Sequence, residues 1–171
     1  MWLLLILALG EVTTTVAENC TLDEGSLGDI RTPDGLNEIP QNCPLLNGSL
    51  FVNVGYSGPF RVPNITNVTD GVRSIEDTDN DQLGIALFDM PDLEETSHID
   101  FVSMPSLTDW STPKLKKVEY IGIEISAHIS LDSPALESSD EVAITANASS
   151  VSLPELVSIS GANEYGNSYS H

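Results

Sequence analysis

The chain carries Pro91-Asp92-Leu93, Pro105-Ser106-Leu107, Pro113-Lys114-Leu115, Pro134-Ala135-Leu136 and Pro154-Glu155-Leu156, which are copies of one pattern, Pro-x-Leu. A weaker copy stands at Pro63-Asn64-Ile65. Recurrence at roughly 20-residue intervals is typical of a solenoid, in which each coil repeats a strand and a turn. Proline suits the turn, where the loss of its N–H costs little. We expect each leucine to point inward and to stack on its counterpart in the next coil.

Short runs of alternating apolar residues separate these turns. In residues 98–102 the pattern predicts Ile99 and Phe101 inward and His98 and Asp100 outward. Similar runs are residues 50–54, 84–88 (Ile85 and Leu87 inward), 121–125 and 142–144, and two apolar pairs, Val118 with Tyr120 and Val157 with Ile159, are expected to form the second side of a coil. Such runs, bounded by turn residues, indicate half-buried strands. The chain is therefore expected to be an all-β, irregular β-solenoid, with the closely spaced Pro105 and Pro113 on two sides of one coil.

Residues 1–17 have the features of a secretory signal. The apolar run over residues 2–9 is too short to cross a bilayer, which needs roughly 20 apolar residues. Thr15-Val16-Ala17 offers a cleavage site, with the cut expected before Glu18. The expected organisation is a signal peptide (1–17), an irregular N-terminal cap broken by glycine and proline (18–46), solenoid coils (47–161) and a disordered tail (162–171).

Two further features agree with secretion. Sequons of the form Asn-x-Ser/Thr begin at Asn19, Asn47, Asn64, Asn67 and Asn147, and we expect most to lie on exposed turns and to carry glycan. The two cysteines, Cys20 and Cys43, predict one disulfide that holds the cap in an oxidising compartment. Neither has a CxxC partner or a neighbouring histidine, so a redox or metal role is not expected.

The charge balance limits the partners. The chain has 26 acidic and 6 basic residues, for a formal net charge of −20. Nucleic-acid binding needs a basic patch to neutralise phosphates, and the basic cluster here is a small one, Lys114, Lys116 and Lys117. We therefore expect no nucleic-acid partner, and the acidity repels anionic membrane surfaces.

Several segments resemble the fungal GPI-anchored cell-wall organisation glycoproteins, whose domain is similar to the receptor L-domain. The resemblance spans about residues 18 to 161. It is carried by residues 43–50 (CPLLNGSL), 90–93 (MPDL), 104–110 (MPSLTDW), 112–115 (TPKL) and 153–161 (LPELVSISG).

The resemblance implies a right-handed, leucine-rich-repeat-like parallel β-solenoid that is glycosylated and held at the wall or the outer face of the plasma membrane. It implies a non-enzymatic role in cell-wall organisation, with wall polysaccharide or wall glycoproteins as partners and no cofactor. The chain ends at His171 without the family's Ser/Thr-rich stalk or apolar tail, so a membrane is expected only through a lipid anchor that this polypeptide lacks. A soluble secreted recognition module is the alternative.

Two clusters invite a metal or catalytic interpretation. Asp77, Asp79 and Asp81 match the first positions of a calcium loop, but Gln82 replaces the required glycine and Phe88 the bidentate glutamate, so we expect a solvated acidic turn. His98 and Asp100 share a strand face, with His128 later in the chain, yet the chain has no GxSxG or HExxH motif. We therefore expect no metal and no catalytic residues.

A polysaccharide-active β-helix is the less favoured alternative. Lyases of acidic sugars need clustered Lys or Arg, and Arg61, Arg73 and the lysine cluster are scattered. Glycosidases need a carboxylate pair about 5–9.5 Å apart, which 26 acids can supply by chance. Among the aromatic residues, Phe101 is expected in the core, and Trp110 is the candidate for an exposed sugar-stacking ring, although packing over the edge of a coil is favoured for it.

Overall fold

In the computed structural model, the described residues are 19–21, 29–30, 32–37, 39, 43–53, 56–75 and 84–159. Three predicted segments lie outside them: the signal peptide (1–17), the acidic turn around Asp77–Asp81 and the tail (162–171). Within the described part, the one helix is α1 (Pro33–Leu36), which begins after the N-cap Thr32. No helix of this part is both long and apolar enough to cross a membrane.

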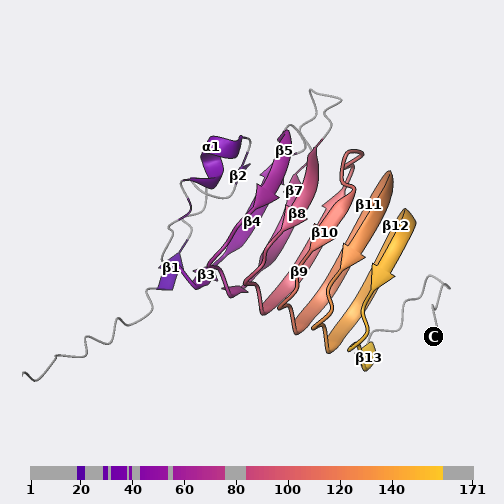
Figure 1. Cartoon of the computed structure of the whole chain (residues 1–171). Coiled ribbons are helices and arrows are strands. Elements are labelled where there is room, and N and C mark those ends of the chain that lie inside the picture. Colours follow the sequence, from indigo (N-terminus) through magenta and orange to yellow (C-terminus); the bar gives the residue numbers. More distant parts are fainter. Residues whose placement is uncertain are drawn as a thin grey trace, which may run out of the picture.

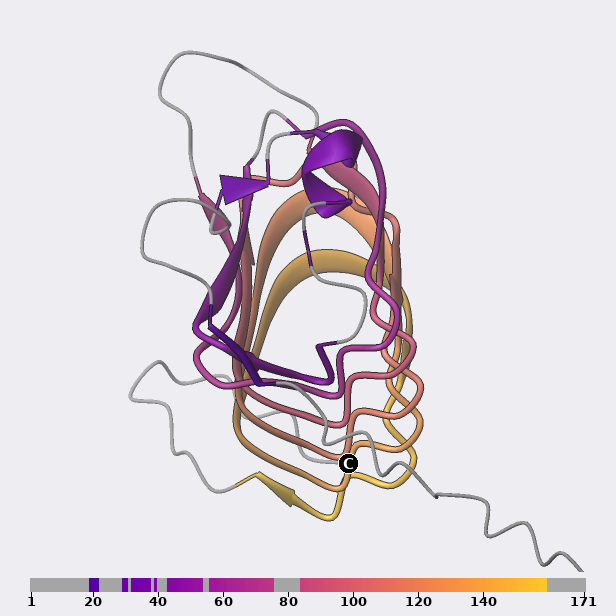
Figure 2. The ribbon, with the colours of Figure 1, turned by 90° about the vertical axis from the view of Figure 1, so that its left-hand side faces the viewer.

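The chain winds into a parallel β-solenoid of about five turns (Figures 1 and 2), as the sequence predicts. Each coil has three sides, which we name the short, middle and return faces. Equivalent residues on the short face are Leu45, Asn67, Glu95, Lys117, Ser138 and Ser158. Contacts between successive coils accordingly join residues 22, 28, 22, 21 and 20 positions apart.

The strands are distributed over the three faces as follows. The short face holds β1 (Asn19–Thr21), β3 (Leu45–Asn47), β6 (Asn67–Val68), β13 (Ser158–Ile159) and the first residues of β9 (Glu95–Val102), β11 (Lys117–Asp132) and β12 (Ser138–Ser152). The middle face holds β2 (Asp29–Ile30), β4 (Ser49–Asn53), β7 (Gly71–Ile75) and the central parts of β9, β11 and β12. The return face holds β5 (Gly58–Arg61), β8 (Ile85–Asp89), β10 (Asp109–Ser111) and the ends of β11 and β12, which bend from one face to the next.

The Pro-x-Leu copies form the corner between the return face and the short face. In each, the leucine N–H donates to the carbonyl of the residue before proline, as Leu115 does to Thr112 at 3.2 Å and Leu136 to Ser133 at 3.2 Å. The N–H of that preceding residue donates to the next coil, as from Thr112 to the Asp132 carbonyl at 3.0 Å. Proline therefore occupies a position that needs no ladder donor, and the leucines at 93, 115 and 136 are fully buried. The inward stacking predicted for them is confirmed.

Pro105 lies at a different corner from Pro113. Met104-Pro105-Ser106-Leu107 forms the same turn between the end of β9 on the middle face and β10 on the return face, with Leu107 fully buried. The prediction that these two prolines stand on two sides of one coil is confirmed.

The predicted alternation holds on the middle face and fails at one point of the return face. Ile99 and Phe101 are fully buried, and His98 and Asp100 lie on the outer side. In β8, however, Phe88 is buried and Leu87 is only half-buried, which contradicts the prediction for Leu87. The cause is a β-bulge: Gly58 pairs with Ile85 and Pro59 with Leu87, so one extra residue, Ala86, reverses the alternation.

The buried aromatic residues form one stack through the core. Phe88 packs against Phe60 at 5.7 Å, against Phe101 at 4.9 Å and against Trp110 at 4.6 Å between ring centroids. Trp110 is 2 % exposed, and its Nε1–H donates to Thr112 Oγ1 at 3.2 Å, which in turn is 2.6 Å from Ser133 Oγ. Trp110 is therefore a core residue: the favoured expectation that it packs against the coil is confirmed, and the alternative of an exposed sugar-stacking ring is wrong. Its burial follows from the register, which places it beside Phe88.

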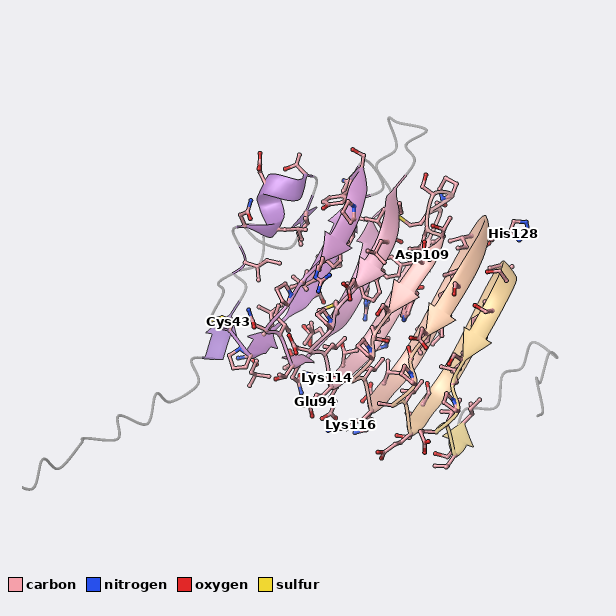
Figure 3. The ribbon with its side chains drawn as sticks, in the orientation of Figure 1. Cys43, Glu94, Asp109, Lys114, Lys116 and His128 are labelled. Carbon is pink, nitrogen blue, oxygen red and sulfur yellow. A yellow bond between two sulfur atoms is a disulfide. The ribbon has the colours of Figure 1, made fainter. Side chains whose placement is uncertain are left out.

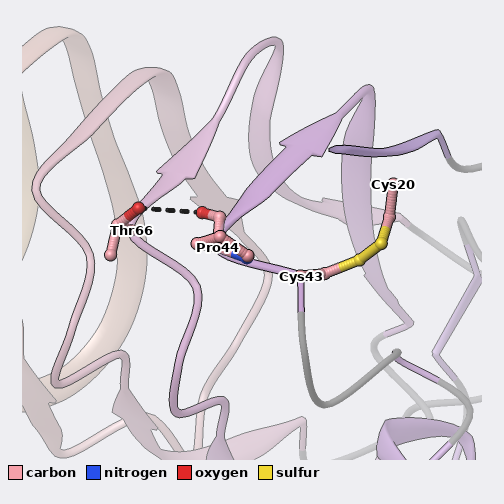
Figure 4. Close-up of a disulfide and its surroundings, with 4 residues drawn as sticks. All are labelled: Cys20, Cys43, Pro44 and Thr66. Carbon is pink, nitrogen blue, oxygen red and sulfur yellow. Dashed lines mark hydrogen bonds between the residues drawn. A yellow bond between two sulfur atoms is a disulfide. The ribbon is translucent and has the colours of Figure 1, made fainter. Parts of the chain in front are cut away.

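The predicted disulfide closes the N-terminal end of the solenoid (Figure 4). Cys20 in β1 and the buried Cys43 are bonded, with 5.7 Å between their Cα atoms. The next residue, Pro44, accepts hydrogen bonds at its carbonyl oxygen from Thr66 Oγ1 at 2.9 Å and Thr66 N at 2.8 Å. The disulfide thus ties β1 to the start of the first coil. The hydrogen bonds at the Pro44 carbonyl then join the backbone of that coil to the second coil.

Candidate functional site

The outer side of the middle face carries His98 and Asp100, which the sequence singled out, together with residues that it did not. Three parallel rows run across the coils there, because equivalent strand positions face the same way. The first row is Ser49, Gly71, His98, Tyr120 and Glu141; the second is Phe51, Arg73, Asp100, Gly122 and Ala143; the third is Val102, Glu124 and Thr145. We call the region around Tyr120, Gly122 and their acidic neighbours the Tyr120 platform.

The centre of the platform is a tyrosine ring seated over a glycine. Tyr120 and Gly122 lie two residues apart on one face of β11. A Cβ atom added to Gly122 would lie 2.5 Å from Tyr120 Cε1, 2.6 Å from its hydroxyl and 2.6 Å from Asp100 Oδ1. The ring therefore fills the space that any other side chain at 122 would occupy, and it is half-buried. Glycine is required here by close approach rather than by its backbone dihedral angles.

The surroundings of the ring are acidic. Burial raises the pKa of the Tyr120 hydroxyl above 10.0, and the charges of Asp100, Glu141 and Glu124 raise it further, because each disfavours a phenolate. Tyr120 is therefore a neutral hydrogen-bonding group at physiological pH. The His98 ring lies 6.1 Å from the Tyr120 ring, and its Nδ1 is 3.3 Å from the Asp70 carbonyl oxygen.

One atom on this face has an unmet hydrogen bond. Arg73, adjacent to Asp100 in the register, has a buried Nε without a hydrogen-bond partner among the described residues. Arg73 lies between Phe51 and Asp100 in its row, so this face combines a guanidinium, several carboxylates and aromatic rings.

The three residues considered for catalysis are not brought together. His98 and Asp100 share the middle face, as predicted, but exposed His128 lies at the bend beyond it, near the upper end of β11 (Figure 3). No group of three or more His, Cys, Asp or Glu side chains within the described ranges is arranged to hold a metal ion.

The predicted lysine cluster forms an ion-pair ladder instead of a basic patch. Lys114 pairs with Asp92 at 2.7 Å, Lys116 with Glu94 at 2.7 Å and Lys117 with Glu95 at 3.1 Å, each across one coil (Figure 3). The Lys114 ammonium and then the Asn64 N–H hold the pKa of Asp92 below its usual value, and Lys116 does the same to Glu94. These cations are therefore used between coils, and the ladder gives no docking site for an anion.

The described sequon residues lie mainly on the first two coils. All except Asn64 lie in strands, so the expectation that most stand on exposed turns is wrong. Asn64 is exposed at a positive φ of 68° beside the corner, and Asn47 and Asn67 are half-buried on the short face. Asn147 lies in β12 on the last coil, and Asn19 lies in β1.

Sequence reasoning missed Tyr120 as a surface residue. It was expected to pair with Val118 on the inner side, but Val118 is buried and Tyr120 faces outward because the chain turns a corner between them. Val157 and Ile159 were also expected inside and are 85 % and 50 % exposed, since no described coil covers them. A signal for the platform does exist: a tyrosine two residues before a glycine within a strand, flanked by acids.

Comparison with protein-family models, with curated proteins and with solved structures finds no match to this chain.

Proposed function

We propose that this chain is a secreted, non-enzymatic cell-surface glycoprotein that contributes to cell-wall organisation by binding neutral wall polysaccharide on its Tyr120 platform. The observation that carries the proposal is the half-buried Tyr120 ring, seated over Gly122 and surrounded by Asp100, Glu124 and Glu141. The resemblance to fungal wall proteins supports the cellular role, and the platform supports the ligand class.

The chemistry of the platform suits a neutral sugar. A pyranose presents an apolar C–H face, which packs on an aromatic ring, and a rim of hydroxyl groups that donate hydrogen bonds to carboxylates. An anionic polymer would be repelled by a chain of net charge −20, whereas a neutral polymer would not. The flat sheet also suits an extended chain that crosses several coils.

Two other features support secretion. The Cys20–Cys43 disulfide is typical of oxidising compartments. The sequon residue Asn64 stands exposed on a turn, where a glycan would meet no neighbouring strand.

A polysaccharide-cleaving activity would use the same surface. Solenoid enzymes hold their carboxylates on an outer sheet, and Asp100, Glu124 and Glu141 supply that chemistry here. Release of new reducing ends from a bound polymer would replace the binding proposal with this alternative.

The proposal is tested by co-sedimentation of the secreted protein with insoluble β-glucan, chitin and mannan. We expect binding to at least one neutral polymer, with little dependence on salt, and a loss of about tenfold in affinity for Tyr120→Ala, equivalent to ~1.4 kcal/mol. Leu87→Ala, which removes a half-buried side chain from the return face, is the matched control and is expected to bind normally. The proposal would be contradicted if the wild-type protein bound none of the three neutral polymers.

A further inference from the structure

Among the described residues, the longest open strand edge lies at the C-terminal end of the solenoid. β12 pairs with β11 along nearly its whole length, but on its other side it pairs with β13 only at Ser138 and Ser139. β12 therefore forms the right-hand border of the sheet in Figure 1, with no described strand beside residues 141–152. The large hydrophobic side chains that are exposed within the described ranges, Val151, Val157 and Ile159, all lie on this end.

This edge lacks the devices that normally prevent strand pairing. Between Glu141 and Glu155 the chain has no charged residue, and its proline, Pro154, comes only after β12 ends. Natural sheet edges are usually protected by lysine, proline or inward-facing charge, because unpaired N–H and C=O groups pair readily with another strand. Val142, Ile144, Ala146, Leu153 and Leu156, which continue the core, are also only partly covered here.

The two halves of β12 lie on different faces of the coil, and the return-face half contains a β-bulge between Ala148 and Ser150. The strand runs along the middle face, bends near Asn147 and returns along the return face, as Figure 2 shows along the solenoid axis. A two-fold axis through this bend, perpendicular to the solenoid axis, maps the middle-face half of the strand onto the return-face half with its direction reversed. Two copies related in this way would pair antiparallel on both sides of the bend, away from the bulge and from β13.

The side chains of the two halves fit this arrangement. Centring the pairing at the bend places Val142 opposite Val151 of the second copy, both on the core side, and Ala143 opposite Ser150 on the outer side. Nearer the bend, the β-bulge between Ala148 and Ser150 interrupts this match. Glu141 then faces Ser152 rather than another acid, so no like charges oppose each other along the paired segment. The other end of the solenoid differs, because its border strands β1, β2 and β5 are only two to four residues long and the disulfide-bonded cap with α1 lies there (Figure 1).

We propose that the β12 edge is a self-association surface, on which a second copy of this chain pairs antiparallel through residues 141–143 and 150–152 to make a two-fold dimer joined at the C-terminal ends of the two solenoids. The dimer continues the sheet across the interface and covers the last layer of the core. The proposal stands independently of the polysaccharide site, although two platforms on one particle would increase avidity for a polymer.

The test is the molar mass of the secreted full-length chain by light scattering at about 50 µM, before and after enzymatic removal of N-glycans, since the Asn147 sequon lies at the centre of the edge. A twofold mass in either state supports the proposal. Val151→Lys is expected to return the mass to that of one chain with its thermal unfolding retained, because Val151 is already half-exposed. Val157→Lys, which places the same charge outside the paired segment, is the control and should stay dimeric. A mass of one chain for the wild type in both states overturns the proposal.

A disulfide-trapping experiment defines the pairing. In the double variant Ala143→Cys/Ser150→Cys, one cysteine lies on the middle face and the other on the return face of the same copy, so the two do not meet within one chain. In the proposed dimer, each of them lies opposite the other cysteine of the second copy. Mild oxidation is expected to give a covalent dimer, whereas Ser150→Cys alone should remain a single chain. Equal cross-linking of the double and single variants would overturn the antiparallel register.

Discussion

The same corner motif has different burial in the interior and at the end of the solenoid. Leu115 and Leu136 are fully buried, whereas Leu156, in an identical Pro-x-Leu turn with the same leucine N–H hydrogen bond, is only partly buried. Leu131 is 1 % exposed, and its register partner Val151 in the last coil is 47 % exposed. The motif therefore specifies the turn, while burial depends on the coil that follows.

The largest expected effect separates these two corners. Leu115→Ala should lower the free energy of unfolding by about 2–5 kcal/mol, because it leaves a cavity between two coils. Leu156→Ala should cost under about 1.5 kcal/mol, since much of that side chain is already in contact with solvent. Urea unfolding of both variants measures the difference, and equal losses would show that a further layer covers Leu156.

Without the disulfide, the N-terminal end of the solenoid would lack a covalent cross-link to its outermost strand β1, as the C-terminal end does to β13. Cys20→Ser/Cys43→Ser is expected to lower stability by about 3 kcal/mol, because the sequence separation of 23 residues no longer constrains the unfolded chain. Thermal unfolding measures this loss. A single cooperative transition should remain, and a loss confined to the cap with the coils unchanged would contradict the role given to the bond.

Hydroxyl pairs between coils give a second comparison of the interior with the end: Thr112 and Ser133 are buried, whereas Ser130 and Ser150 are exposed. Thr112→Val removes the acceptor of the Trp110 N–H inside the core and should cost about 1–3 kcal/mol, because that donor is left buried and unpaired. Ser150→Ala removes the exposed hydroxyl pair with Ser130 on the last coil and should change stability by under about 0.5 kcal/mol. Chemical unfolding distinguishes the two, and a neutral Thr112→Val would mean that the Trp110 N–H has found another acceptor.

The smallest effect is expected from the lysine ladder between two interior coils. Lys116 lowers the pKa of Glu94 below 4.5, so this stabilisation is present above pH 4.5 and is lost as pH falls through the folded value. Glu94 raises the pKa of Lys116 above 10.5, so the stabilisation that the lysine contributes is present below pH 10.5 and is lost as pH rises through the folded value.

Lys116→Met should lower Tm by no more than ~2 °C near neutral pH, with the difference vanishing in acid. Lys116→Arg is the control, and a difference that persists at pH 3 would contradict an ionic cause.

Much of the fold follows from two local signals in the sequence, the period-2 apolar runs and the prolines of the Pro-x-Leu copies. Period-2 runs such as Ile99 to Phe101 fix which side of a strand is buried, and proline fixes the corners. The errors arise where non-local register decides. The bulge at Ala86 makes Phe88 the buried residue in place of Leu87, and the corner before Tyr120 turns its ring outward. The complete platform does not follow from the sequence, because its residues come from three coils and alternation within one strand does not say which neighbours the register supplies.

The most direct test of the central claim is the affinity of Gly122→Val for the polysaccharide that the wild-type protein binds. Valine is favoured in a strand and leaves Tyr120 and the carboxylates in the chain, but its side chain takes the space in which the ring lies. We predict a loss of affinity of about tenfold with Tm retained, matching Tyr120→Ala. Unchanged affinity in a variant whose ring is displaced would contradict the claim that the seated Tyr120 ring forms the binding surface.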